Sequence, residues 1–362
     1  MVLKKEQGKK KRIVSQEALA KRLGARMAKK FGEDAVQPIE SASSNIKDWY
    51  STTIPPLDLI ISGKIGQGFP SNRICEMFGS ESIGKTSIGG TLMRTIQQLG
   101  GLGVFIDSES TFDNARCKAL RVDSNKLLYL DLDNVEDTMD AILELLDGAK
   151  ENKMLIFWDT LAGTMAKGEE GRRIGEAGLG IHARVMSQAM RKLTKPLARS
   201  RASIIICNQR KEGAIGVPFA TERDKNKTLG GAAIDFHAHN RLFIQFNRKL
   251  VHTVGKNKVN LGFETTAKLI KNKSGKSHIP VRMVFLEEAG GHYDAGLSCL
   301  RTLQHWKLLP TSNTSISFAG KKHSFLGWKK RYDKEKSFRE EVHAALEKGF
   351  KIQIKENEEN VE

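Results

Sequence analysis

Short apolar runs alternate with amphipathic stretches through the middle of the chain. Strands are predicted at the apolar runs 74–78, 103–107, 127–132, 154–158, 203–207, 242–246, 265–270 and 281–286. Apolar residues at helical spacing predict helices over 87–99, 135–146 and 181–195, the last one stopped by Pro196. Strands that alternate with helices form a mainly parallel sheet with helices on both faces, so the predicted fold class is α/β.

The two ends of the chain depart from this pattern. Apolar positions at helical spacing predict a helix over 17–31, which is too isolated to bury its apolar face and is expected to dock on a neighbouring subunit. The sequence of residues 292–350 predicts a small α-containing lobe with Trp306, Phe318, Trp328 and Tyr332 in its core. We therefore expect a basic arm and oligomerisation helix (1–49), a core (50–289), a C-terminal α+β lobe (290–350) and an acidic disordered tail (351–362).

One stretch of the core carries the most specific chemistry. Residues 79–86 fit the phosphate-loop pattern G-x-x-x-x-G-K-[ST] at every fixed position and lie between a predicted strand and a predicted helix. Backbone N–H groups of such a loop bind phosphate oxygens, Lys85 would reach the β- and γ-phosphates, and Thr86 would ligate Mg²⁺. The predicted nucleotide-binding residues are Gly79, Ser80, Glu81, Ser82, Ile83, Gly84, Lys85, Thr86 and Ser87.

Polar side chains follow three further predicted strands, at the edge where ligands of a parallel sheet collect. Asp159 comes after the run 154–158 and would hold the hydration shell of Mg²⁺. Glu109 is the leading candidate for orienting the attacking water, with a helix cap or a solvated acid as the alternative. Gln209 is a candidate γ-phosphate sensor, with a plain turn as the alternative.

The charge balance indicates a polyanionic partner. A net charge of +17 favours nucleic acid first and an anionic membrane surface second, with solubility alone as the alternative. Two segments, 168–180 and 210–228, are expected to be mobile cationic loops that suit a phosphate backbone, and Phe219 could stack on bases. The candidate DNA-binding residues are Arg172, Arg173, Arg210, Lys211, Phe219, Arg223, Lys225, Lys227, Gly230 and Gly231.

Cysteine spacing and hydropathy indicate in which cellular compartment the protein is expected. The cysteines at 75, 117, 207 and 299 suggest neither a metal site nor a disulfide framework, which fits a reducing compartment. No apolar run approaches the ~18 residues of a membrane span, and no apolar segment follows the N-terminal lysines. We expect a cytoplasmic protein without a membrane partner.

Several ordered stretches together resemble the RecA-type strand-exchange recombinases over roughly residues 15–350. They are 76–86, 105–109, 183–193, 207–209, 230–236 and 270–273. The resemblance implies an ATP-driven helical filament on single-stranded DNA that pairs and exchanges homologous strands in recombination and in the repair of DNA damage. It also implies that duplex DNA enters through the C-terminal lobe, and that single-strand-binding and loader proteins are partners.

The resemblance further implies roles for individual residues. Glu109 would activate the attacking water, and Asp113 and Arg116 would lie near the adenine. Segments 169–178 and 210–229 would be the DNA-binding loops, with Gln209 coupling ATP to the second. Lys271 and Lys273 would reach the ATP of the neighbouring subunit, and Phe236 would lie at the same subunit interface. The acidic tail resembles a segment that restrains access of DNA.

The chain also departs from the family pattern. Arg172 and Arg173 stand where the family is usually more acidic, the second loop is longer, and Asp235 occupies a position where bacterial members commonly have lysine. These features and the basic arm suggest a divergent, viral-type member. The alternatives are a ring-forming DNA helicase or packaging motor, and a DNA-binding mediator without catalysis. The joint presence of Lys85, Thr86, Glu109 and Asp159 argues against the second alternative.

Overall fold

The computed structural model describes residues 15–42, 45–148, 151–170, 180–210, 227–254, 257–311 and 315–359. The chain divides into two compact units, Met1–Asn45 and Ile46–Glu362. In the first unit, α1 (Gln16–Phe31) confirms the predicted N-terminal helix, and the Ser15 hydroxyl caps it by accepting a hydrogen bond from the Ala18 N–H. The turns η1 (Glu33–Ala35) and η2 (Ile39–Ser41) follow. Every residue of α1 is at least partly exposed, and its docking on another subunit stays a prediction.

A large sheet organises the second unit. Among the described residues its strands lie in the order β11-β10-β9-β8-β3-β7-β6-β4-β5. The pairs from β5 to β8 are parallel and those from β8 to β11 are antiparallel, which confirms the predicted α/β class with a mainly parallel sheet. The strands are β3 (Ile74–Gly79), β4 (Leu102–Asp107), β5 (Leu127–Leu130), β6 (Lys153–Asp159), β7 (Arg201–Gln209), β8 (Asn240–Val254), β9 (Asn257–Asn272), β10 (Val281–Leu286) and β11 (His292–Asp294). A short ribbon pairs β1 (Trp49–Tyr50) with β2 (Phe69–Pro70).

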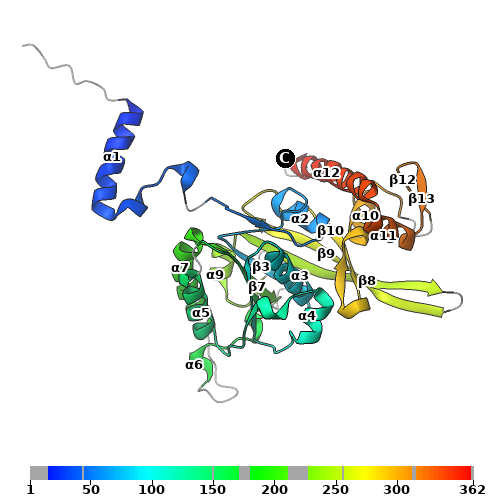
Figure 1. Ribbon diagram of the computed structural model, residues 1–362, viewed down its shortest axis with the longest axis horizontal. Helices are drawn as coiled ribbons and strands as arrows, with labels where there is room; N and C mark the ends of the chain where they lie inside the picture. Colours follow the sequence, from blue (N-terminus) through cyan, green and yellow to red (C-terminus); the bar gives the residue numbers. More distant parts are fainter. Residues whose placement is uncertain are drawn as a thin grey trace, which may run out of the picture. The chain divides into compact units, whose positions relative to one another are not determined.

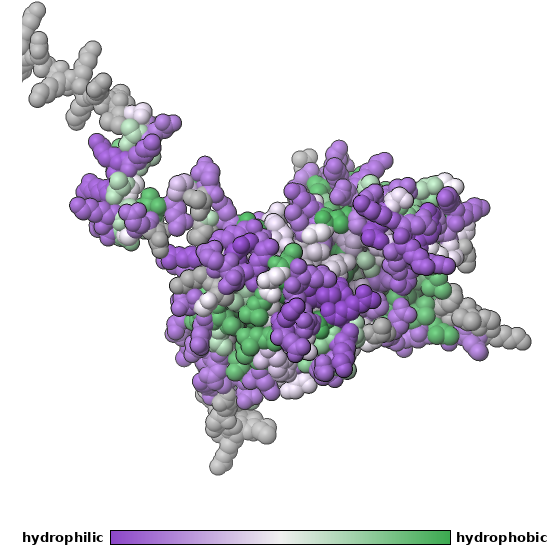
Figure 2. Space-filling view, viewed as in Figure 1, coloured by the Kyte–Doolittle hydropathy of each residue, from purple (hydrophilic) through white to green (hydrophobic). Residues whose placement is uncertain are grey.

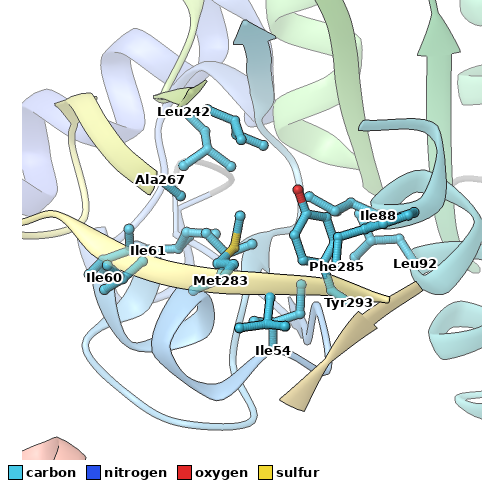
Figure 3. Packing of buried hydrophobic residues seen from close by; sticks show 14 of the residues in the cluster. Ile54, Ile60, Ile61, Ile88, Leu92, Leu242, Ala267, Met283, Phe285 and Tyr293 are labelled. Atoms are coloured by element: carbon cyan, nitrogen blue, oxygen red, sulfur yellow. The ribbon is translucent and has the colours of Figure 1, made fainter. Parts of the chain in front are cut away.

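Helices cover both faces of the sheet because its central strands are apolar on both sides. Along β6, Met154, Ile156 and Trp158 pack with α5 (Val135–Gly148) and α7 (Ile181–Arg199), in one hydrophobic cluster. Leu155 and Phe157 point the other way, into a second cluster with α2 (Pro55–Ser62), α3 (Lys85–Gln98) and α4 (Asn114–Leu120). Figure 3 shows part of this second cluster, where residues of α2 and α3 meet β8, β9 and β10. The shorter elements are η3 (Ser124–Lys126), η4 (Leu161–Gly163), α6 (Lys167–Glu170), α9 (Ala232–His237) and η5 (Glu288–Gly290).

The C-terminal lobe is confirmed as an α+β segment. It contains α10 (Ala295–His305), β12 (Ile316–Phe318), β13 (Lys321–His323), α11 (Phe325–Lys334) and α12 (Lys336–Glu359). Trp328 is fully buried, and its ring centroid lies 5.2 Å from that of Phe318 and 5.0 Å from that of Phe338. This lobe shares the hydrophobic cluster of α2 and α3, and the predicted boundary near residue 290 stays a prediction.

Two expectations about helix ends are corrected. The predicted disordered tail is helical through Glu359, because Ile354 packs against the lobe and Glu358 pairs with Lys276 at 2.5 Å. Likewise, α7 continues through Pro196 to Arg199. Proline removes one backbone hydrogen bond there, but Leu197 is buried in the same cluster as Leu193, and this packing holds the last turn.

The β8–β9 hairpin extends beyond the other strands of the sheet (Figure 1). It is far longer than the predicted strands 242–246 and 265–270, since β8 and β9 pair from Asn240 with Asn272 to Val254 with Asn257. Figure 2 shows hydrophilic side chains over most of the visible face of the second unit. None of the helices in the described part of the chain combines the length and the apolarity that crossing a bilayer requires.

Candidate nucleotide site

The phosphate loop has the surroundings that its sequence predicts. β3 is fully buried and ends at Gly79, and α3 begins at Lys85. A Cβ atom at Gly79 would lie 2.1 Å from the Ile244 carbonyl oxygen of β8, so only glycine fits there. Gly84 has φ of 83°, a left-handed conformation that favours glycine and turns the chain into α3. The two glycines are therefore required by the backbone as well as by the motif.

Lys85, Thr86 and Asp159 are brought together at the start of α3. The Lys85 ammonium is buried and donates a hydrogen bond of 2.5 Å to the Ser80 carbonyl oxygen, across the loop. The Thr86 hydroxyl donates to Asp159 Oδ2 at 2.6 Å. Burial raises the pKa of Asp159, and the hydrogen bond from Thr86 and the charge of Lys85 oppose this rise. A carboxylate and a hydroxyl on neighbouring elements provide the hard oxygen ligands that Mg²⁺ prefers, so the residues present fit this ion.

The loop after β4 is folded around the carboxylate of Asp107. Asp107 is fully buried and its Oδ2 accepts hydrogen bonds from the N–H groups of Thr111 and Phe112, both at 2.8 Å. Its Oδ1 accepts from the N–H of Glu109 at 3.2 Å, and the Tyr129 hydroxyl donates to Oδ2 at 3.1 Å. This carboxylate thus fixes the backbone that carries Glu109.

A second set of contacts ties this loop to the end of β6. The Ser108 hydroxyl donates to the Thr160 carbonyl oxygen at 2.7 Å and accepts from the Thr160 N–H at 2.9 Å. The Thr160 hydroxyl donates to Glu109 Oε1 at 2.9 Å. Glu109 is solvent-exposed, yet both its backbone and its carboxylate are held. The candidate base is therefore positioned by two strand ends.

A polar cavity of about 690 Å³ opens over these groups. Most of its lining comes from the ends of β3, β4, β6 and β7, as the parallel topology requires. The remainder comes from the end of β10 and the turn after it. The lining residues are Glu81, Ser82, Gly84, Lys85, Thr86, Ser87, Glu109, Thr111, Arg116, Asp159, Thr160, Gln209, Phe285, Glu287, Gly290 and Gly291.

Some predicted nucleotide residues lie outside this lining and support it instead. Gly79 packs on β8, and Ile83 is buried with its carbonyl oxygen accepting from the Tyr293 hydroxyl at 2.5 Å. The carbonyl oxygen of Ser80 accepts the hydrogen bond from the Lys85 ammonium. Asp113 caps α4 by accepting from the Arg116 N–H at 2.8 Å, whereas the Arg116 side chain itself lines the cavity.

Gln209 lines the cavity at the end of β7, beside a buried polar network. Asn208 donates to Glu76 Oε1 at 2.9 Å and to the Leu229 carbonyl oxygen at 2.9 Å. Glu76, fully buried on β3, also accepts from the Thr228 hydroxyl at 2.7 Å and from Arg241 Nε at 2.5 Å. This network joins the strand that leads into the phosphate loop to the end of the second predicted DNA loop.

Lys271 and Lys273 lie away from the cavity lining of their own chain. The Lys271 ammonium donates to the carbonyl oxygens of Asp235 and of Phe236, the latter at 3.0 Å. Burial and the nearby cations Lys273 and Arg241 lower the pKa of Lys271 to about 8. The Asp235 carboxylate forms an ion pair with Arg241 in the same chain.

Most of the predicted DNA-binding side chains lie outside the described residues, namely Arg172, Arg173, Lys211, Phe219, Arg223 and Lys225. The backbone of Arg210 forms an isolated antiparallel β-bridge with that of Thr228. The guanidinium carbon of Arg210 lies 5.3 Å from the centre of the Phe243 ring. Lys227 is exposed. Gly230 and Gly231 have positive φ values of 86° and 66° and lead into α9. The beginning of the first predicted loop is corrected, because residues 167–170 form α6.

Sequence reasoning missed the residues that support and close the site. The roles of Asp107 and Thr160 depend on contacts between strand ends that no local pattern reveals. The cavity lining also includes Phe285, at the end of β10, and Glu287, Gly290 and Gly291 from the turn after it. The pair Gly290-Gly291 was the available signal, since both glycines have φ of 83°.

Comparison with known proteins agrees with this geometry. The family description "RecA N-terminal domain" matches residues 17–290. The protein named RecA of Rhodopirellula baltica is 33% identical over 264 residues, which cover 73% of this chain and 67% of the relative. RecA of Streptococcus uberis is 32% identical over 263 residues, which cover 68% of each chain. RecA of Lactococcus lactis (strain IL1403) is 32% identical over 249 residues, covering 69% of this chain and 62% of the relative.

The strand–loop–helix site at the edge of a mainly parallel sheet defines a phosphate-loop protein of the α/β class. Within that class, the chain belongs to the RecA family. Membership supports a role in DNA recombination and repair, with ATP and DNA as ligands.

Proposed function

We propose that this chain is a DNA-dependent ATPase that forms helical filaments on single-stranded DNA and catalyses homologous pairing and strand exchange. One observation carries the proposal. Lys85, Thr86, Asp159 and Glu109, which come from three strand ends, line one polar cavity of about 690 Å³. Such a cavity can hold a nucleoside triphosphate with its γ-phosphate between a phosphate loop and a base.

In this proposal, ATP lies along the loop 79–86 with its phosphates at the N-terminus of α3. Lys85 stabilises the charge of the β- and γ-phosphates, and Glu109 orients the attacking water and accepts its proton. Thr86 and Asp159 would hold Mg²⁺, which neutralises phosphate charge when bound. Arg116 lies in the lining and is our candidate contact to the base, with Asp113 fixing the turn before it.

We assign single-stranded DNA to the segments 169–178 and 210–229. Gln209 lines the nucleotide cavity and directly precedes the second segment, so it is the proposed sensor that couples ATP to DNA. The network of Asn208, Glu76 and Thr228 supports this coupling, because it connects β3 with residues just after that segment. The C-terminal lobe, with its lysines and Arg331, is our candidate contact for duplex DNA.

Self-association would complete the site. Lys271 and Lys273 lie outside their own cavity, and Phe236 beside them is 74% exposed, so we assign them to the nucleotide of a neighbouring subunit. Lys271 and Lys273 would then add positive charge to the transition state in trans. Single-strand-binding and loader proteins are proposed partners, and the cytoplasm is the proposed location.

The decisive experiment combines ATP hydrolysis with imaging. We expect ATP turnover that single-stranded DNA stimulates, and filaments in negative stain with DNA and a non-hydrolysable ATP analogue. Lys85→Ala should abolish turnover, whereas Lys118→Ala, an exposed lysine on α4, should leave it unchanged. A Lys85→Ala protein with full DNA-stimulated turnover would refute the assigned site. Closed rings instead of open filaments would point to the helicase alternative.

A further inference from the structure

A second cavity lies away from the nucleotide site, between the base of the β8–β9 hairpin, β10 and α10. It has a volume of about 370 Å³ and is called here the arginine cavity. Arg282 and Phe285 are three residues apart on β10, so their side chains point to opposite faces of the sheet. Phe285 lines the nucleotide cavity, whereas Arg282 lines the second cavity. The lining residues are Asn247, Arg248, Glu264, Arg282, Arg301, Gln304, His305 and Thr311.

Two of the arginines in this cavity share one carboxylate. Arg248 donates from Nε to Glu264 Oε2 at 2.9 Å and from Nη2 to Oε1 at 3.1 Å. Arg301 Nε lies 2.7 Å from Glu264 Oε1, and both side chains of this second pair are 5% exposed. The third arginine, Arg282, donates from Nη1 to the Thr266 hydroxyl at 2.6 Å. The lining therefore carries three guanidinium charges and one carboxylate charge.

This excess of positive charge is unfavourable in a partly desolvated cavity. Burial lowers the pKa of both Arg282 and Arg301, which expresses the same cost. Burial, together with Arg282, also lowers the pKa of His305, so this imidazole adds no positive charge at neutral pH.

The cavity also contains a donor in need of an acceptor. Asn247 uses its Oδ1 to accept a hydrogen bond from the Thr266 hydroxyl at 2.7 Å. Its Nδ2 is buried and has no hydrogen-bond partner among the residues that the structure describes. A buried amide donor without a partner is unfavourable, and an acceptor oxygen in the cavity would satisfy it.

We propose that the arginine cavity binds a phosphate dianion, either free orthophosphate or the terminal group of a phosphate monoester. Its charge of about −1.5 to −2 at pH 7 matches the excess of two positive charges in the lining. Phosphate oxygens match the paired N–H groups of a guanidinium, and a further oxygen can accept from Asn247. A phosphodiester has one charge and two bulky substituents, so it matches the charge of this cavity less well.

The test is calorimetric titration of the full chain with orthophosphate at constant ionic strength. The nucleotide site is filled beforehand with a non-hydrolysable ATP analogue and Mg²⁺, because a phosphate loop itself binds phosphate. We expect one saturable site per chain. Arg248→Gln and Arg282→Gln should each weaken binding about tenfold or more, since a hydrogen bond to a charged group contributes about 1.5–3 kcal/mol. Thermal unfolding of both variants checks that they fold, and Arg248 is 63% exposed and not needed for packing.

Matched probes make the outcome specific. Lys249→Gln removes a charge from the residue next to Arg248, on the other face of β8, and should bind orthophosphate as the parent does. Dimethyl phosphate should bind this cavity at least tenfold more weakly than orthophosphate. The proposal is overturned by an absence of saturable binding, by unchanged affinity in both arginine variants, or by equal affinity for dimethyl phosphate.

Discussion

The hydroxyl of Thr160 donates a hydrogen bond of 2.9 Å to a carboxylate oxygen of Glu109. The two residues are 51 positions apart and follow adjacent parallel strands, β6 and β4. Because β4 and β6 are paired in a fixed register, this hydrogen bond holds an exposed carboxylate in a defined position. Glu109 could otherwise rotate freely, since its side chain is exposed to solvent.

Removing this contact should reduce turnover without removing the base. We expect Thr160→Val to lower kcat about tenfold or more while KM for ATP changes little, because a hydrogen bond to a charged group is worth about 1.5–3 kcal/mol. Thr160→Ser keeps the hydroxyl and should restore most of the rate. Steady-state ATP hydrolysis with single-stranded DNA measures both. Equal rates for the valine and serine variants would show that the hydroxyl does not position Glu109.

Replacing the base itself should have a larger effect. Glu109→Gln keeps the size of the side chain and can still accept from Thr160, but it cannot take up a proton. We expect kcat to fall about 10²–10⁴-fold, the usual contribution of a general base, with ATP binding retained. Hydrolysis assays and binding of a fluorescent ATP analogue separate the two effects. Loss of nucleotide binding together with turnover would assign Glu109 to the phosphate site instead.

The ion pair between Glu76 and Arg241 should matter for stability. Both side chains are at most 5% exposed, so Arg241→Met leaves a buried carboxylate without its charged partner. We expect a loss of about 3–5 kcal/mol in the free energy of unfolding, measured by denaturant titration. Glu340→Gln breaks the exposed pair with Lys336 and should cost at most about 1 kcal/mol. Similar losses in the two variants would contradict this ranking.

His239 should make the fold sensitive to acid. Burial and nearby cations, of which Arg73 is the largest contributor, lower the pKa of its imidazole to about 4, whereas an unfolded histidine titrates near 6.5. The neutral ring, 2.6 Å from the Ser274 hydroxyl, stabilises the fold above pH 6.5. This contribution is lost as pH falls from about 6.5 to about 4, and it amounts to roughly 3 kcal/mol.

The check is denaturant unfolding at several pH values. His239→Asn cannot titrate, so its stability should fall less steeply between pH 6.5 and 4 than that of the parent chain. An exposed histidine provides the control, and His278→Asn should leave the slope unchanged. Parallel curves for the parent and the His239→Asn variant would show that another group causes the loss in acid.

The phosphate loop was predictable because its spacing is local. Gly79, Gly84 and Lys85 occupy fixed positions in one short segment, and the buried strand before them is apolar except for Glu76. Glu109 and Asp159 followed from the rule that parallel strands end at one edge of a sheet. The family resemblance then added Lys271 and Lys273, whose proposed partner lies outside the chain.

Other features depend on contacts that no local pattern records. The β8–β9 hairpin was predicted too short because charged residues such as Arg248, Lys249 and Lys258 interrupt its apolar alternation, and the far part of the ribbon buries little. Asp107 looked like one more strand-end acid, yet it organises the loop that holds Glu109. The end of α12 has the composition of a polar tail, because the contacts that stabilise it are distant in sequence. Ile354 packs against the hydrophobic cluster, and Glu358 pairs with Lys276.

The long hairpin has a mechanical consequence for the nucleotide site. In the described part of the chain, β8 pairs with β3 only through residues 240–244, and beyond them it pairs with β9 alone over much of its length. Paired ribbons of this kind twist and bend more readily than a wide sheet. A molecule that pulls on the hairpin tip would thus deform the ribbon first, and β3 would keep the phosphate-binding turn in its geometry.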